Sequence, residues 1–103
     1  MNYILVLQWP GRTEADYDGL IAMEDLLLAE LPEAHGLVDG HDFGSGEMNI
    51  FIHTERPLEA FADVMTTLGS HSRWADARAA YRSIDSEDFV ILWPKTLEEF
   101  EVL

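Results

Sequence analysis

The chain has no cysteine, and this absence narrows the chemistry open to it. Disulfides, zinc–thiolate sites and thiol catalysis all need cysteine side chains, so the sequence excludes each of them. Basic residues are also scarce, because 6 Lys and Arg stand against 20 Asp and Glu, for a formal net charge of −14 in 103 residues. Proteins that bind nucleic acids normally carry a basic patch, so DNA and RNA are not expected partners. The charge permits a basic protein partner, or it simply favours solubility.

Long hydrophobic runs are missing too. No apolar stretch approaches the roughly 20 residues that span a bilayer, and an acidic surface is poorly suited to anionic membranes. The opening residues, MNYILVLQWPG, lack the basic region with which a signal peptide begins. We therefore expect a cytoplasmic protein that does not bind membranes.

The remaining composition is that of a folded domain, because 48% of the residues are hydrophobic. Apolar runs that end at proline or glycine predict strands, and apolar residues at helical spacing after an N-cap or a proline predict helices. These patterns predict strands at 3–9 and 89–93, a hairpin over 36–54, long helices at about 13–31 and 57–68, and a short helix at about 73–82. Residues 95–103 form an acidic tail whose apolar residues predict that it docks on this single domain, 1–103.

The predicted element order is β-α-β-β-α-(α)-β, which resembles the ferredoxin-like superfamily of α/β plaits over nearly the whole chain. The resemblance, which extends to small bacterial proteins of this fold, lies in element order alone. It implies an α+β fold in which a four-stranded antiparallel sheet carries both long helices on one face. No catalytic motif of a particular family accompanies it, so it implies no activity.

A plait of this kind leaves one face of its sheet open. The first predicted strand is apolar on both faces, with Leu5 and Leu7 on one and Ile4 and Val6 on the other. An open apolar face is a liability on a monomer, so we expect a second subunit, the short helix and tail, or a ligand to cover it. Ferredoxin-like proteins often pair sheet to sheet, and this resemblance favours a homodimer through the open face.

The hairpin region, GLVDGHDFGSGEMNIFIHT over 36–54, mixes strand-forming residues with titratable ones. If it turns at Ser45-Gly46, Asp42 faces Asn49 and Val38 faces His53. Alternation then divides the side chains between two faces. The core face carries Asp39, His41, Phe43, Met48, Ile50 and Ile52, and the open face carries Val38, Asp42, Asn49, Phe51 and His53.

On the open face, His53 is a candidate acid or base that Asp42 would orient, with Asn49 as a binding residue beside them. The alternative is that Asp42 and Asn49 hydrogen-bond around the turn while His53 lies near solvent. Asp39 and His41 form a second candidate group on the other face.

Glu24 falls within the apolar stripe of the first predicted helix, between Leu20 and Leu27. Burial of a carboxylate in such surroundings is one way in which proteins make a general base. Asn49, His41 or an arginine could pair with it. Alternatively, Gly19 shifts the helical phase and leaves Glu24 in water. Gly19 costs the helix about 1 kcal/mol relative to alanine, so it could also mark a close approach to another element.

Half of the six basic residues, Arg73, Arg78 and Arg82, fall within the predicted short helix. On a helix, Arg78 and Arg82 lie one turn apart and could bind an anion together. Ion pairs with neighbouring acidic residues such as Asp85 are the alternative.

Nothing in the sequence predicts a cofactor, and the four histidines show no spacing typical of a metal site. The composition best fits a non-catalytic binding or regulatory module that acts as a homodimer, for example an acidic immunity protein or antitoxin with a basic target. The alternative is a small dimeric enzyme with an acid/base pocket at the sheet, in which His53, Asp42, Glu24 and His41 are the catalytic candidates. A structural subunit of a larger assembly is a third possibility.

Overall fold

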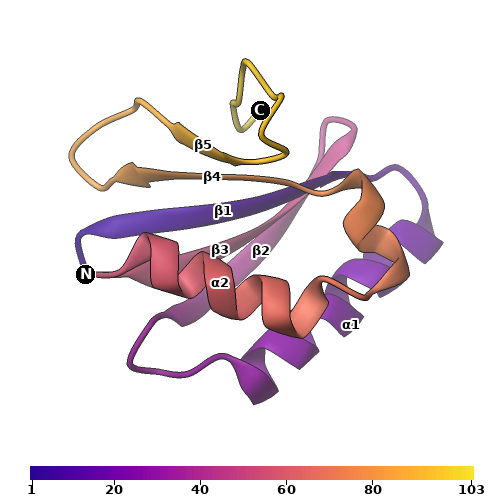
Figure 1. Ribbon diagram of the computed structural model, residues 1–103. Helices are drawn as coiled ribbons and strands as arrows, with labels where there is room; N and C mark the ends of the chain where they lie inside the picture. The colour runs from indigo at the N-terminus through magenta and orange to yellow at the C-terminus, as the bar shows by residue number, and fades with distance from the viewer.

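Five antiparallel strands and two helices make up the α+β fold of the computed structural model, which describes residues 1–103. The sheet order is β2-β3-β1-β4-β5, and both helices pack on one side of it (Figure 1). The elements are β1 (Tyr3–Pro10), α1 (Glu14–Glu30), β2 (Leu37–Gly44), β3 (Glu47–Thr54), α2 (Pro57–Leu68), the 3₁₀ helix η1 (Ser72–Asp76), β4 (Arg78–Ser83) and β5 (Val90–Trp93). The α+β class is confirmed, but the sheet has five strands and not four.

The two long helices begin and end where the sequence predicts. Thr13 caps α1 in a capping box, since the Asp16 amide donates to Thr13 Oγ1 and the Thr13 amide donates to Asp16 Oδ2, each at 3.1 Å. The helix ends just before Leu31 and Pro32. Pro57 opens α2 at a position where proline is favoured. Neither helix combines the length and hydropathy needed to cross a bilayer.

The hydrophobic core lies between the helices and one face of the sheet. Alternate residues of β1 and β3 point into it, and the predicted row of Met48, Ile50 and Ile52 is fully buried there. The helices complete the core with Leu20, Met23, Leu27, Val64 and Leu68, and β1 contributes Leu5, Leu7 and Trp9. The opposite face of the sheet, called the open face below, is free of both helices (Figure 1).

The short helix predicted over 73–82 is wrong beyond Asp76. After η1 the chain continues as β4, which pairs with the free edge of β1 and satisfies its backbone groups. Ala79 and Tyr81 alternate toward the core, opposite Leu7 and Leu5. The helical interpretation failed because the buried residues of this segment fit spacings of both 3–4 and 2.

The hairpin prediction holds near its turn and fails farther from it. Ser45 and Gly46 have φ values of 57° and 82°, as a two-residue hairpin turn requires, and Asp42 lies opposite Asn49. A β-bulge between Val38 and Gly40 then shifts the register by one residue. Val38 therefore lies opposite Ile52, and Leu37 takes the place opposite His53 that was predicted for Val38.

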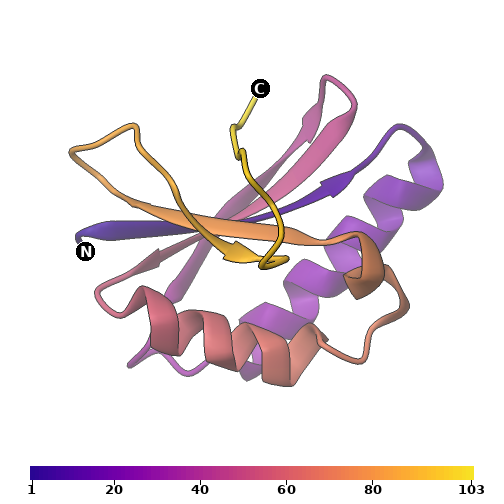
Figure 2. The same ribbon diagram turned by 45° about the horizontal axis from the view of Figure 1, so that its top comes forward.

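The chain after β4 turns back over the open face. Figure 2 shows the segment beyond β5 crossing the sheet on the side away from the helices. We call residues 95–103 the tail. Its backbone is held by buried side chains of the sheet, because Gln8 Nε2 donates to the Glu101 carbonyl at 2.9 Å and the Leu103 amide donates to Glu47 Oε2 at 3.2 Å. The tail and the loop 84–89 thus become walls on a face that helices leave uncovered.

Candidate binding pocket on the open sheet face

A pocket of about 810 Å³ lies between the open face, the loop 84–89 and the tail. Its apolar lining comes from three parts of the chain that are distant in sequence. Ile4, Val6 and Phe51 come from the sheet, Ile84 and Phe89 from the loop, and Phe100 and Val102 from the tail. The rings of Phe89 and Phe100 meet edge to face with 4.9 Å between centroids. This contact fastens the loop to the tail and closes one side of the pocket.

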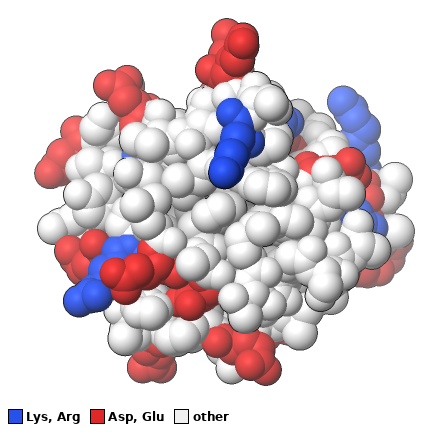
Figure 3. All heavy atoms as spheres, viewed as in Figure 1, with Lys and Arg blue, Asp and Glu red and all other residues white.

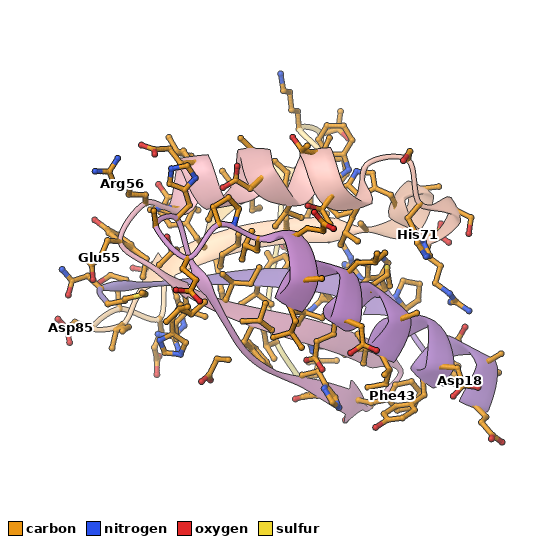
Figure 4. The ribbon with its side chains drawn as sticks, turned by 90° about the horizontal axis from the view of Figure 1, so that it is seen from below. Asp18, Phe43, Glu55, Arg56, His71 and Asp85 are labelled. Carbon is orange, nitrogen blue, oxygen red and sulfur yellow. The ribbon has the colours of Figure 1, made fainter.

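Acidic residues outnumber basic ones around this pocket. Asp39, Asp85, Glu87 and Glu101 line it, against Arg82 and the titratable His53. Figure 4 places Asp85 at the end of the sheet opposite to Phe43. The excess of carboxylates agrees with the net charge of −14, and Figure 3 shows acidic side chains around the margin of one face of the molecule with few basic ones among them. The pocket therefore favours a cation over an anion.

His53 lines the pocket, and its carboxylate partner is Asp39. His53 Nε2 lies 3.3 Å from Asp39 Oδ2, with the two side chains 34% and 64% exposed. The β2 bulge next to Asp39 makes this pairing possible, whereas the uninterrupted register placed Asp39 on the core face. Asp42, the partner that the sequence suggested, lies opposite Asn49 and does not line the pocket.

Arg82 binds the backbone of the loop 84–89 and its flanking residue. Its Nη1 donates to the carbonyls of Ser83, Ile84 and Ser86 at 3.2, 3.4 and 3.0 Å, and its guanidinium lies 6.0 Å from the centre of the Phe89 ring. Arg78 does not converge with it. The two residues share the open face of β4, opposite Gln8 and Ile4, and four residues of a strand separate them by roughly 13 Å.

A buried polar cluster lies on the same face, beside the pocket. Gln8, Asn49 and Glu47 are only 1%, 0% and 7% exposed. Gln8 Nε2 donates to Glu47 Oε2 and Asn49 Oδ1, and Asn49 Nδ2 donates to Glu47 Oε2, all at 3.0 Å. A second pocket of about 490 Å³, lined also by Arg78 and Leu103, adjoins this cluster. Asn49 is thus a member of a polar network, as its predicted place on the open face allows.

Glu24 and His41 come together on the core side of the sheet. His41 Nδ1 lies 3.1 and 3.0 Å from the two oxygens of Glu24, whose side chain is 12% exposed. Of the partners that the sequence left open for Glu24, the structure selects His41. Tyr17 packs edge to face on both His41 and Phe43, with 5.9 and 5.6 Å between ring centroids. The four catalytic candidates are therefore not one site, because the sheet separates this pair from His53.

The other histidines stabilise local structure. His35 links its loop to α2 through Asp63 and Glu59, at 2.6 and 3.1 Å. His71 Nδ1 accepts from the Arg73 amide and caps η1. No group of three or more His, Asp or Glu side chains is arranged to hold a metal ion.

Sequence reasoning did not single out Gln8, Phe89 or Phe100 as parts of a site. Gln8 could have been found, since it is the one polar residue in the apolar run of 3–9. A polar side chain in a strand buried on both faces needs a hydrogen-bond partner. No protein-family model, curated protein or solved structure matches the chain, so the functional conclusion rests on the geometry of this face.

Proposed function

We propose that this chain is a non-catalytic binding module whose ligand is a basic, partly apolar segment of a partner protein. One observation supports this most directly: the pocket combines an apolar floor with a rim of four carboxylates, Asp39, Asp85, Glu87 and Glu101. Burial of an apolar group against Ile4 and Phe51, which unlike Val6 keep exposed surface, would supply much of the affinity. The carboxylates would select a cation and speed its association, so binding should weaken as salt rises.

Three small probes of similar shape and different charge test this proposal. Benzylammonium, benzyl alcohol and phenylacetate share an aromatic ring, so only the pocket's charge distinguishes them. In NMR titrations of the intact chain, we expect benzylammonium to bind most tightly and to shift the signals of Phe51 and His53. Equal shifts from all three probes, or tighter binding of phenylacetate, would rule out a site selective for cations.

Variants that each remove one carboxylate test whether the selectivity for a cation comes from the rim of the pocket. Asp85→Asn and Glu87→Gln each remove one charge from the rim and should lower the affinity for benzylammonium. Asp18→Asn and Asp25→Asn remove the same charge from exposed positions on α1, away from the pocket. They should leave binding nearly unchanged, so equal losses in all four variants would indicate only a general effect of net charge.

We also propose that the fold is a ferredoxin-like plait. The order β2-β3-β1-β4, with both helices on one face, supports a ferredoxin-like plait to which β5 is appended. An acidic, cytoplasmic immunity- or antitoxin-like protein is a concrete form of this function. The homodimer through the open face remains a prediction. The tail, itself a single segment, already lies on part of that face, so we favour one extended segment of a partner over a second flat sheet as the ligand.

The pairing of His53 with Asp39 favours one alternative, a small enzyme in which His53 is the general base and Asp39 orients its ring. Such a base would remove a proton from carbon next to a carbonyl group of a ligand in the pocket. Deuterium exchange at that position in simple keto acids, followed by NMR in heavy water, tests it. Exchange that is lost in His53→Gln would support the enzyme, and exchange that is equal in the variant and the wild type would exclude it.

A further inference from the structure

We propose that the cluster of Gln8, Asn49 and Glu47 is a binding site for the main chain of an extended peptide, which the tail fills in the free protein and a basic partner segment fills in the complex. This inference rests on the proposed function, because it names how the partner segment would be held. It adds contacts beside the pocket that bind main-chain groups and not side chains. Displacement of the tail would also remove Glu101 from the rim, which would keep Asp39, Asp85 and Glu87.

The hydrogen bonds to the tail have the spacing of an extended chain. The site binds the carbonyl of Glu101 and the amide of Leu103, at 2.9 and 3.2 Å. Main-chain groups two residues apart point to the same side of an extended backbone, which is the geometry that strand-adding peptide sites use. Residues 98–103 belong to no helix or strand. The side chains of Gln8 and Glu47 therefore supply the main-chain hydrogen bonds that a neighbouring strand would supply in a sheet.

The side chains of the site hold one another in place as well as the tail. Gln8 Nε2 has two N–H groups and three acceptors, Glu47 Oε2, Asn49 Oδ1 and the Glu101 carbonyl, so one N–H is shared between two of them. The bonds within the cluster, at 3.0 Å, fix the direction in which Gln8 and Glu47 present their polar atoms. A preorganised donor and acceptor lose little freedom on binding. Main-chain contacts do not depend on the identity of side chains, so another extended segment could replace the tail without loss of these two bonds.

The tail forms a boundary that two pockets share. Phe100 and Glu101 border both the pocket of about 810 Å³ and the neighbouring pocket of about 490 Å³. Phe100 and Val102 fill positions over the apolar floor. A segment that replaced the tail would have room on both sides and would place its own apolar residues where these two now lie.

The tail is also a poor electrostatic match for its own site. It carries Glu98, Glu99 and Glu101, and the two pockets beside it are lined by Glu47, Asp39, Asp85 and Glu87 against only two arginines, Arg78 and Arg82. Like charges on neighbouring segments weaken an association. A segment with Lys at the glutamate positions would keep the backbone bonds and apolar contacts while reversing the sign of the charge, which is why a basic partner should displace the tail.

Two synthetic peptides test the exchange on the intact chain labelled with ¹⁵N. One has the sequence of residues 95–103, and the other has Lys in place of its three glutamates. At low salt we expect the basic peptide to bind at least about tenfold more tightly than the acidic one. On binding, the side-chain amide signals of Gln8 and Asn49 should shift, and the signals of residues 98–103 should move to positions typical of a disordered chain.

Variants of the tail and of the Gln8 cluster distinguish the binding site from the segment that now fills it. Phe100→Ser weakens the tail and should raise the affinity for the basic peptide about tenfold, since more molecules then have a free site. Val102→Ser serves the same purpose if Phe100→Ser does not fold. Adding Gln8→Leu to either variant should reverse the gain, whereas Leu58→Ser, at a position 62% exposed on α2, should not.

The outcomes distinguish this inference from the proposed function. If the basic peptide binds while the tail signals stay in place and Gln8→Leu has no effect, the main-chain site is wrong and the pocket proposal stands. If neither the basic peptide nor benzylammonium binds, both are wrong. If the acidic and basic peptides bind equally well, the claim that a basic segment displaces the tail because of its charge is wrong.

Discussion

Asp39 Oδ2 lies 3.3 Å from His53 Nε2 because β2 has a bulge between Val38 and Gly40. Strict alternation along β2 would place Asp39 with His41 on the core side of the sheet. The extra residue of the bulge turns its carboxylate instead toward the rim of the pocket, over the strand that carries His53. A local irregularity thus sets which acid His53 meets and adds one carboxylate to the rim.

Asp39→Asn should weaken the binding of benzylammonium without a large loss of stability. The pair is partly solvated, with side chains 34% and 64% exposed, and such pairs contribute about 0–1 kcal/mol. We expect the free energy of unfolding to change by less than about 1 kcal/mol. Urea unfolding and NMR titration measure the two effects. Asp42→Asn is the matched control, since Asp42 lies on the same strand but outside the pocket; an equal loss of binding there would contradict the assignment.

Arg82→Ala should make the loop 84–89, which borders the pocket, more mobile. The guanidinium binds three carbonyls of 83–86, and their loss should speed amide hydrogen exchange across 84–89. Arg82→Lys should restore little of the protection, because an ammonium group lacks the planar fork of donors. Hydrogen exchange followed by NMR reports the change residue by residue.

Arg56→Ala is the control for Arg82→Ala. Arg56 forms an exposed pair with Glu59 on α2, so its removal should leave exchange in 84–89 unchanged. Unchanged exchange in Arg82→Ala as well would show that the loop is held by its apolar contacts and not by this arginine.

Element boundaries in this chain could be predicted where a capping residue or a proline marks them. Thr13, Pro32 and Pro57 each coincide with a helix end, because each acts through a local effect on the backbone. The strand β4 could not be found in this way. Its conformation is decided by pairing with β1, which is distant in sequence, and its side-chain pattern fits a helix as well.

In the candidate site too, features set by local sequence were predicted and features set by distant contacts were not. The hairpin turn at Ser45-Gly46 was predictable from glycine, and it placed Asn49 correctly on the open face. The bulge has a weaker signal, the isolated Gly40 inside the strand pattern, whose φ is 157° in the structure. The prediction assumed an uninterrupted register, so it gave His53 the wrong carboxylate partner. The apolar residues of the tail predicted that it docks, but not where. Its contacts with Gln8 and Glu47 join segments that are 93 and 56 residues apart in sequence, and no local pattern encodes such a pairing.

Gly19→Ala should not give the gain in stability that alanine normally gives in a helix. A Cβ at this position would collide with Arg73 Nε and lie 2.9 Å from Cδ and Cζ, so the end of the arginine side chain would have to move. Arg73 now donates to Asp16 Oδ1 at 2.9 Å and to the Ala15 carbonyl at 3.1 Å. The close approach that the sequence suggested at Gly19 is therefore this arginine, and its displacement offsets the gain in helix propensity.

A double-mutant cycle measures the offset. In an Arg73→Ala background, Gly19→Ala should raise the free energy of unfolding by about 1 kcal/mol, the ordinary difference between glycine and alanine in a helix. In the wild-type background the gain should be smaller or reversed. Urea unfolding gives all four values, and the same gain in both backgrounds would show that Arg73 moves aside without cost.

Asp16 should make stability depend on pH in the acid range. The backbone amide of Arg12, the Arg73 guanidinium and the backbone amide of Thr13 all donate to its carboxylate and hold its pKa well below the usual range for Asp. A carboxyl whose pKa is lowered by folding stabilises the folded state above its unfolded pKa, about 3.9 for Asp. That stabilisation is lost as pH falls below this value toward the folded pKa.

The wild type and Asp16→Asn should therefore differ in stability by a constant amount near neutral pH and by a shrinking amount below about pH 4. Asparagine keeps one oxygen that can accept from the Thr13 amide but loses the second acceptor, which now binds Arg73. The change of the difference with pH, and not its size near neutral pH, therefore reports the charge. Asp18→Asn is the control, because Asp18 is exposed on the same helix and forms no ion pair. Thermal unfolding across the acid range measures the difference. A gap that stays constant into strong acid would mean that capping, and not the ionised carboxylate, accounts for the contribution of Asp16.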